Sequence, residues 1–349
     1  MSNISHVVRR VDFAVARLVA LRLMAIPLSL LVVATFAFAL VALMPGDPAV
    51  QILGQFASDQ ELATLRAQLG TDLPLLQRYG LFIMGLLHGD LGVSFVSGRP
   101  VWDEIAQYLP ATIELIVLSS LGAVLIGLLI GGIGAYYSGR WPDRGSSWVI
   151  TLFQSVPDFL VALLLIFLLF YVLRLVPPPI GRLGFGSSGP KAVTGMLLID
   201  TFISGDFAAF SRVARASIVP VLTLSVVYSA YIGKISRTTI GAALESDQTL
   251  YARGCGLSEW QVVKYALLQS RTTILTYGAI LFGSLLGGAA IIETVFSWRG
   301  VGQWALQSML KLDVPAIQGF IIVVGGVTLL LYLLLDIAVM LLDPRIRIQ

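Results

Sequence analysis

The sequence predicts an all-α integral membrane protein with six transmembrane helices and both termini in the cytoplasm. Three observations lead to this fold class. Apolar residues make up 57% of the chain and charged residues only 12%, so a water-soluble fold would expose far too much apolar surface. Six apolar runs have the length needed to cross the hydrocarbon core of a bilayer. The segments between these runs differ in their content of lysine and arginine.

The apolar runs define the spans, because a helix rising about 1.5 Å per residue needs about 20 apolar residues to cross the membrane. The first run contains Ala37-Phe38-Ala39, which fits a signal-peptide cleavage pattern, but its length favours an uncleaved anchor. Pro157 and Asp158 interrupt the third run, and the fourth is short and contains Pro220. The expected spans are residues 23–43, 113–137, 148–173, 216–233, 272–292 and 314–342.

The orientation follows from the basic residues, which are enriched on the cytoplasmic side of membrane proteins. With a cytoplasmic N-terminus, the inner segments carry 13 lysines and arginines and the longer outer segments carry ten. The second outer segment alone carries five and argues for the opposite orientation, but long loops obey the bias weakly. The expected inner segments are 1–22, 138–147, 234–271 and 343–349, and the outer segments are 44–112, 174–215 and 293–313.

The first outer segment is expected to form two short amphipathic helices rather than a flexible linker. Ser58 and Glu61 have the spacing of a capping box, and Gly70 stands where a helix would end. A second helix is expected from Pro74 to Gly89, with Asp72 as its cap. In the second outer segment, an apolar stretch at residues 196–210 is interpreted as interfacial or re-entrant.

Several chemical functions lack support in the sequence. The glycine pattern at residues 184–189 has no preceding strand, and Gly233-Lys234 lacks the loop that cradles phosphates in ATP-binding proteins. Cys255 is the only cysteine, which excludes a site with several thiolate ligands. No dense basic stripe indicates nucleic-acid binding. We therefore expect no catalytic residues, no cofactor and no metal on this chain, and no nucleic-acid partner.

The inner segment 234–271 is expected to contain a two-helix element. Leu250 to Gly254 would form a short helix, Gly256 would break it in a left-handed conformation, and Ser258 would cap the next helix. Small residues at positions 252 and 256 would permit close approach of a partner, while Tyr251 and Leu257 offer apolar anchors. By spacing alone, this element is equally an ordinary helical hairpin between two spans.

Ordered motifs along nearly the whole chain resemble one family. They are MPGDPA at residues 44–49, GDLGVSFVSGRPV at 89–101, YLPATIEL at 108–115, TLYARGCGLS at 249–258, IIETVFSWRGVGQ at 291–303 and LLDPRIR at 341–347. This series is similar to that of bacterial ABC-importer permeases of the dipeptide, oligopeptide and nickel family. Three departures are Leu250, where broader permease families often carry an acidic residue, the absence of a proline near Thr273, and Arg299, which replaces the proline of a PGLG turn.

The resemblance implies the type I ABC importer fold, with a permease domain at about residues 90–349, in the bacterial inner membrane. It implies a homologous second permease subunit, two cytoplasmic ATPase subunits that bind the ATP and magnesium, and a periplasmic or lipid-anchored substrate-binding protein. Peptides are the first expectation for the cargo, with nickel, metal chelates, glycosides or oligosaccharides as alternatives. The residues that would dock onto the ATPase as a coupling helix are Leu250, Tyr251, Ala252, Arg253, Gly254, Gly256, Leu257 and Ser258.

Charged residues in or near the spans are costly in lipid and are candidates for the outer gate or for helix packing. These candidates are Asp47, Glu114, Asp158, Glu293 and Arg299. Repeats of small residues at Gly127-xxx-Gly131 and Gly283-xxx-Gly287 could serve interhelical packing. Two other classes remain open: a secondary carrier, although neither internal repeats nor ion sites are clear, and a membrane hydrolase, which would need His6 or His88.

Overall fold

The computed structural model describes residues 24–43, 46–54, 56–184, 189 and 192–342. Within these ranges all regular structure is helical, apart from one isolated antiparallel bridge between Val93 and Pro100. Five helices are long and apolar enough to cross a membrane, and a bent pair of helices supplies a sixth candidate span. The all-α prediction is confirmed, whereas the side of the membrane on which each terminus lies stays a prediction. The segments 1–22 and 343–349 lie outside the described residues.

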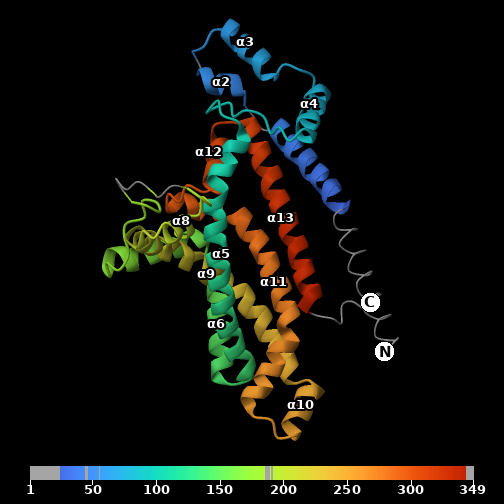
Figure 1. The fold of residues 1–349 in the computed structure, drawn as a ribbon, viewed down its shortest axis with the longest axis vertical. Coiled ribbons are helices and arrows are strands. Elements are labelled where there is room, and N and C mark those ends of the chain that lie inside the picture. Colours follow the sequence, from blue (N-terminus) through green and yellow to red (C-terminus); the bar gives the residue numbers. More distant parts are fainter. Residues whose placement is uncertain (1–23, 44–45, 55, 185–188, 190–191, 343–349) are drawn as a thin grey trace.

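Long helices form the body of the molecule, and α5, α11 and α13 follow its long axis (Figure 1). Several are longer than the apolar runs that predicted them, because hydropathy marks the lipid-facing part of a helix and not its ends. Because the backbone hydrogen bonds are made within the helix, the helix can continue into polar residues before and after its apolar run. The long helices are Met24–Ala42, α5 (Val101–Tyr136), α9 (Phe207–Leu244), α11 (Glu259–Val295) and α13 (Val314–Leu342).

The third predicted span is broken. It consists of α6 (Trp141–Ser155) and a second part made of α7 (Asp158–Leu165) and η1 (Ile166–Val172), and the two parts are bent by 102°. Val156 at the break is extended, with φ −99° and ψ 127°. Proline disfavours the helical conformation of the residue before it, so Pro157 ends α6 and then begins α7. The sequence located the interruption, but not the size of the bend.

Short helices gather at the two ends of the molecule. α2 (Pro48–Leu53), α3 (Asp59–Leu69) and α4 (Leu75–Leu87) lie at the end opposite to α10 (Asp247–Gly254), as Figure 1 shows. The predicted capping box of α3 is present, since Ser58 and Glu61 bond reciprocally, and Gly70 ends the helix at φ 66°. The prediction that Asp72 caps α4 is wrong. Pro74 occupies the cap position without a side-chain bond, because Asp72 lies too far before the first helical residue.

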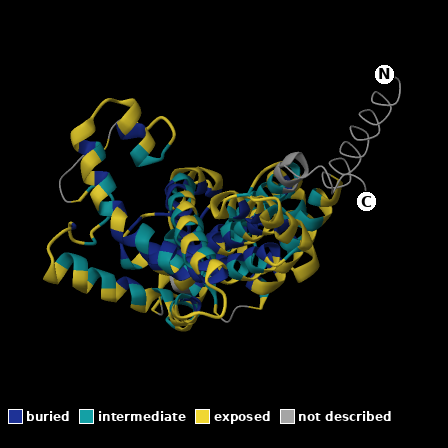
Figure 2. Cartoon of the chain, turned by 90° about the horizontal axis from the view of Figure 1, so that it is seen from below, coloured by how far each residue is buried: buried dark blue, intermediate teal, exposed yellow. Residues whose placement is uncertain are grey.

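The core is built around the contact between α5 and α9, the most extensive of any helix pair. Glycines on α5 let the two backbones approach closely. A Cβ added to Gly127 would lie 2.6 Å from Cβ of Ile232, and a Cβ added to Gly131 would lie 2.5 Å from the carbonyl oxygen of Gly233. The first predicted small-residue repeat is thus a packing surface. The second repeat packs at one position only: a Cβ on Gly283 would lie 2.6 Å from the hydroxyl oxygen of Tyr332 in α13, whereas a Cβ on Gly287 would meet nothing within 4 Å. Figure 2 shows buried residues gathered where helices pack together and exposed residues on their outward faces.

Candidate functional site

The predicted coupling element contains helix α10, which begins earlier than the sequence suggested. Ser246 caps it, its side chain accepting a hydrogen bond from the backbone N–H of Thr249 at 3.4 Å. The Thr249 hydroxyl in turn donates to the carbonyl oxygen of Ala243, the next-to-last residue of α9, at 2.7 Å. Thr249 is buried. These contacts fix the start of α10 against the end of α9.

The other end of α10 is held against α11. Gly256 has φ +81°, the positive value predicted for it, and the backbone N–H of Leu257 donates to the Ala252 carbonyl oxygen at 3.2 Å. Ser258 forms a capping box with Gln261 at the start of α11. Leu257 packs against the buried cluster of α9 and α11 residues around Val262. Leu257 is only partly buried in this contact, so it anchors the base of the element while its predicted part in docking stays a prediction.

Two side chains of α10, Leu250 and Tyr251, are large, apolar and exposed. Tyr251 is 76% exposed and Leu250 is 52% exposed, and they lie at the end of the molecule far from α2, α3 and α4 (Figure 1). A hollow of about 640 Å³ lies beside them, lined in part by Ala252 and Tyr265. Large exposed apolar patches on proteins mark contact sites for partners. The sequence reasoning missed Trp260, which is 76% exposed. Its position two residues after the predicted cap, Ser258, could have identified it as an aromatic residue at the start of the next helix, and exposed tryptophans often contribute to protein interfaces.

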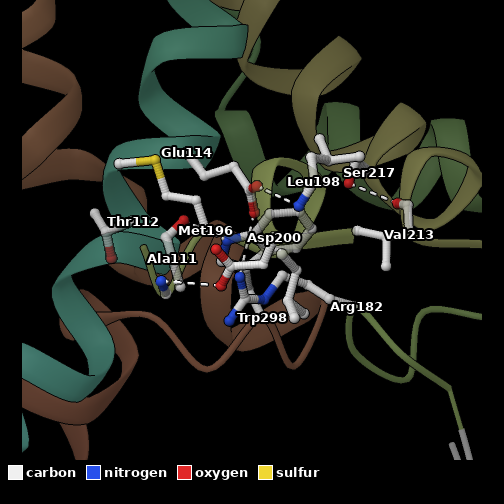
Figure 3. Close-up of polar contacts among 12 residues, drawn as sticks. Ala111, Thr112, Glu114, Arg182, Met196, Leu198, Asp200, Val213, Ser217 and Trp298 are labelled. Atoms are coloured by element: carbon white, nitrogen blue, oxygen red, sulfur yellow. Dashed lines mark hydrogen bonds and ion pairs between the residues drawn. The ribbon is translucent and has the colours of Figure 1, made fainter. Parts of the chain in front are cut away.

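In the first half of α5, Glu114 is nearly fully buried and pairs with Arg182, at 3.2 Å between Oε2 and Nη1. Its second oxygen accepts the backbone N–H of Leu198 in α8 (Leu197–Ile203) at 2.7 Å. Figure 3 shows Arg182 also lying against Trp298, with its guanidinium carbon 5.5 Å from the ring centroid. The sequence reasoning missed Arg182, although a buried carboxylate requires a partner. Glu114 thus connects α5 to the segment at residues 174–215, through Arg182 and Leu198.

Glu293 is fully buried at the junction of α11 and α12 (Val301–Leu310). Its two oxygens accept from the hydroxyl of Thr112 and, at 2.7 Å, from the backbone N–H of Gln303. A Cβ added to Gly300 would lie 2.2 Å from Glu293 Oε1, which explains a glycine in this turn. The indole of Trp298 donates to the Ala111 carbonyl oxygen at 2.8 Å. The network ties the turn after α11 to α5.

Arg299 lies on the same turn, next to this network, with its side chain exposed. Its φ is +57°, a left-handed value that the proline ring cannot adopt because it fixes φ near about −65°. The departure of this chain from the proline of the PGLG turn therefore has a structural basis. The backbone N–H of Arg299 donates to Gln303 Oε1 at 2.9 Å, so the carbonyl side of that amide is occupied.

The other two charged candidates lie elsewhere and apart. Asp47 caps α2 and pairs with Arg66 of α3 at 2.5 Å. Burial favours a higher pKa for Asp47, but the hydrogen bonds from Arg66 and Ala49 outweigh it and hold the pKa below its usual value. Asp158 stands at the bend between α6 and α7. The structure therefore brings together Glu114, Glu293 and Arg299, and not all five. No cluster of metal-binding side chains exists among the described residues.

Comparison with protein families decides the class. Residues 123–348 match the family described as "Binding-protein-dependent transport system inner membrane component", and residues 15–116 match its N-terminal companion family. The chain belongs to this family. It is therefore a multi-pass membrane subunit of a transport system, and the predicted family is confirmed. The roles assigned to single residues of this permease stay predictions.

Curated relatives of the permease cover almost its full length. The probable D,D-dipeptide transport system permease protein DdpB of Escherichia coli K12 is 36% identical over 90% of this chain and 92% of its own. The dipeptide permease DppB of Alkalihalophilus pseudofirmus is 34% identical over 89% and 93%. The di/tripeptide permease DppB of Pseudomonas aeruginosa is 36% identical over 89% and 93%. Chains of two solved structures, an amino acid ABC transporter and a methionine ABC transporter, align with TM-scores of 0.44 and 0.47 at 19% and 15% identity.

Proposed function

We propose that this permease forms half of the translocation pathway of an ATP-driven importer for dipeptides or oligopeptides in the bacterial inner membrane. The observation that carries the proposal is the full-length similarity to permeases whose names specify dipeptide and di/tripeptide transport. A homologous permease would supply the other half, and a binding protein would deliver the peptide from outside. Two cytoplasmic ATPase subunits would bind ATP and magnesium, so this chain would do mechanical and not chemical work.

Helix α10 is suited to receive force from an ATPase because it is exposed on one side and anchored on the other. Thr249 fixes its start to α9, and Leu257 fixes the following turn to the cluster that joins α9 and α11. Both of these helices continue without interruption through the body of the molecule. A displacement of α10 would therefore move α9 and α11 with it, which is the rigid-body motion that alternating access requires.

A further contact would spread this motion to α6. Arg237 of α9 pairs with Asp143 of α6 at 2.5 Å, and the same carboxylate accepts the Gly139 backbone N–H at 3.0 Å. The pair lies at the α10 end of the molecule, where α5 turns into α6. A pull on α10 would thus reach α9, α11 and α6 through contacts that are already formed.

The test uses the assembled importer in liposomes. Tyr251→Asp places a charge on the exposed face of α10 without changing its buried anchors, and Tyr251→Phe is the matched control that keeps the ring. We expect Tyr251→Asp to lose copurification with the ATPase subunits and ATP-driven peptide uptake, while Tyr251→Phe retains both. Uptake by Tyr251→Asp at the rate of the unmodified importer would remove α10 from the docking site.

The rival class is tested by leaving the partners out. A secondary carrier would transport solute when this chain alone is placed in liposomes under an ion gradient, and that result would replace the importer proposal. The cargo is tested separately by identifying the ligand that copurifies with the associated binding protein. Nickel, a metal chelate, a glycoside or an oligosaccharide in place of a peptide would keep the importer and change its substrate.

A further inference from the structure

A second hollow, of about 230 Å³, lies where α5 meets α12, at the end of the molecule far from α10. It is next to the Glu293 network and shares the turn that carries Arg299. The side chains around it are those of Gln107, Tyr108, Arg299, Gln303, Trp304 and Gln307. The lining therefore contains three amides, one guanidinium and two aromatic rings. Which ligands it can bind depends on the hydrogen bonds that the amides already make.

Two of the amides already accept a hydrogen bond on their oxygen. Gln107 Oε1 accepts from Arg99 Nη1 at 3.1 Å, and Gln303 Oε1 accepts from the backbone N–H of Arg299 at 2.9 Å. An amide side chain has one acceptor oxygen and an NH₂ group with two donors. One lone pair of each oxygen is therefore taken, while the NH₂ groups of Gln107 and Gln303 supply up to two donors each.

The charge of the lining is positive. Arg299 is exposed, and among the described residues no carboxylate forms an ion pair with it. Glu104 and Glu293 are not among the side chains that line the hollow, and both point hydrogen-bond acceptors at lining residues: Glu104 accepts from Trp304 Nε1 at 3.1 Å, and Glu293 accepts from the backbone N–H of Gln303 at 2.7 Å. A guanidinium flanked by amide donors is an arrangement that favours a carboxylate, which arginine can hold through two parallel hydrogen bonds.

We propose that this hollow binds the C-terminal carboxylate of the transported peptide. The inference rests on the proposed peptide cargo and adds the part of the peptide that this permease recognises. Arg299 carries the charge, and the NH₂ groups of Gln107 and Gln303 complete the donor set. Tyr108 and Trp304 are stacked with ring centroids 6.3 Å apart and form an apolar wall for the last side chain of the peptide.

The binding test uses the importer assembled without its binding protein, so that only the membrane subunits can hold the peptide. Cys255→Ser removes the native thiol, and Gln307→Cys places a new one at the exposed edge of the hollow. Alanyl-alanine should slow maleimide labelling of the introduced cysteine, and alanyl-alanine amide should not. Arg299→Gln should weaken the protection by about tenfold or more in peptide concentration, the effect of losing one charged hydrogen bond.

Arg174→Gln is the matched control, because Arg174 is also an outer-segment arginine with a left-handed backbone, at φ 52°, and does not line the hollow. It should leave the protection unchanged. Equal protection by the acid and the amide, or full protection in Arg299→Gln, would overturn the proposal. ATP-driven uptake of alanyl-alanine by the complete importer separates the two claims. Uptake without protection would refute the hollow and keep the peptide cargo. Protection without uptake would leave a carboxylate-binding hollow but would overturn the claim that it holds the transported peptide.

Discussion

The glycine face between α5 and α9 gives the sharpest test of the fold. Replacing a glycine by alanine should lower the stability of the protein at one of two neighbouring positions and leave it unchanged or raise it slightly at the other. Gly131 is buried against α9, and a Cβ there would lie 2.5 Å from the Gly233 carbonyl oxygen and 3.0 Å from the Arg237 backbone nitrogen. A Cβ on Gly132, one position along the same helix, would meet nothing within 4 Å. We therefore compare Gly131→Ala with Gly132→Ala.

The expected magnitude follows from what each methyl group meets. At Gly131 the obstacle is backbone, which cannot rotate away, so the helices must separate, and overpacking of this kind costs about 1–3 kcal/mol. Separation by even a fraction of an ångström also weakens the dispersion contacts of Gly127 along the same face. Against this stands the greater helix propensity of alanine, worth up to about 1 kcal/mol. At Gly132 only the favourable contribution remains.

The assay measures the unfolding temperature Tm of the detergent-solubilised importer. Samples are heated and then separated by size-exclusion chromatography, and Tm is read from the fluorescence of the peak that contains the intact importer. We expect Gly131→Ala to lower Tm by about 2–4 °C, from a net cost of about 1–2 kcal/mol at roughly 2 °C for each kcal/mol, and Gly132→Ala to leave it unchanged or slightly higher. Gly287→Ala, another glycine whose Cβ would meet nothing within 4 Å, serves as a second control on α11. If Gly131→Ala and Gly132→Ala had the same Tm, the close packing of α5 on α9 would be disproved.

Three further predictions concern orientation, a buried pair and pH. Cys255, the only cysteine and an exposed one, should react with a membrane-impermeant maleimide only after cells are permeabilised, and labelling of intact cells would invert the proposed topology. Glu114→Met should lower the free energy of unfolding, measured with denaturant, by about 3–5 kcal/mol, because it leaves Arg182 buried without its partner. Adding Arg182→Met should recover part of that loss. If the losses of the two single variants simply added in the double variant, the result would argue against the pair. Burial favours a raised pKa for Asp200, but hydrogen bonds from Thr194 lower it overall, so its stabilising contribution is complete above about pH 4 and is lost as pH falls through the lowered pKa. Hydrogen exchange at the Thr194 amide should show protection that is constant from about pH 7 to 5 and falls in stronger acid, and protection that rises on acidification would contradict this.

Local sequence signals predicted much of the helical framework. The capping box at Ser58, the left-handed Gly256 and the interruption at Pro157 were each found from residues a few positions apart. Asp72 failed as a cap for the same local reason, since a proline two residues later occupied the cap position. The ends of the long helices were missed because hydropathy responds to lipid contact, whereas a helix ends where its backbone hydrogen bonds end.

The candidate functional residues were predicted only in part. Glu114, Glu293 and Arg299 were identified as charged residues near spans, but their partners were not. Glu114 meets Arg182 across 68 residues, and Glu293 meets Thr112 across 181. No pattern within one helix contains such a pair. The hollow at Arg299 likewise could not be predicted, because its lining combines Gln107 and Tyr108 of α5 with residues of α12, and only the packing of these two helices brings them together.

The sequence by itself determined that this protein lies in lipid, that its backbone is helical, that Ser58 caps α3 and to which transporter family the chain belongs. These properties follow from composition, from runs of about 20 residues and from motifs, all of which exist before the chain folds. Only the tertiary structure decided which glycines pack against a neighbouring helix, how the buried carboxylates are neutralised and which donors face the hollow beside α12. Those features depend on contacts between helices, and the distance between two helices is set by the whole fold.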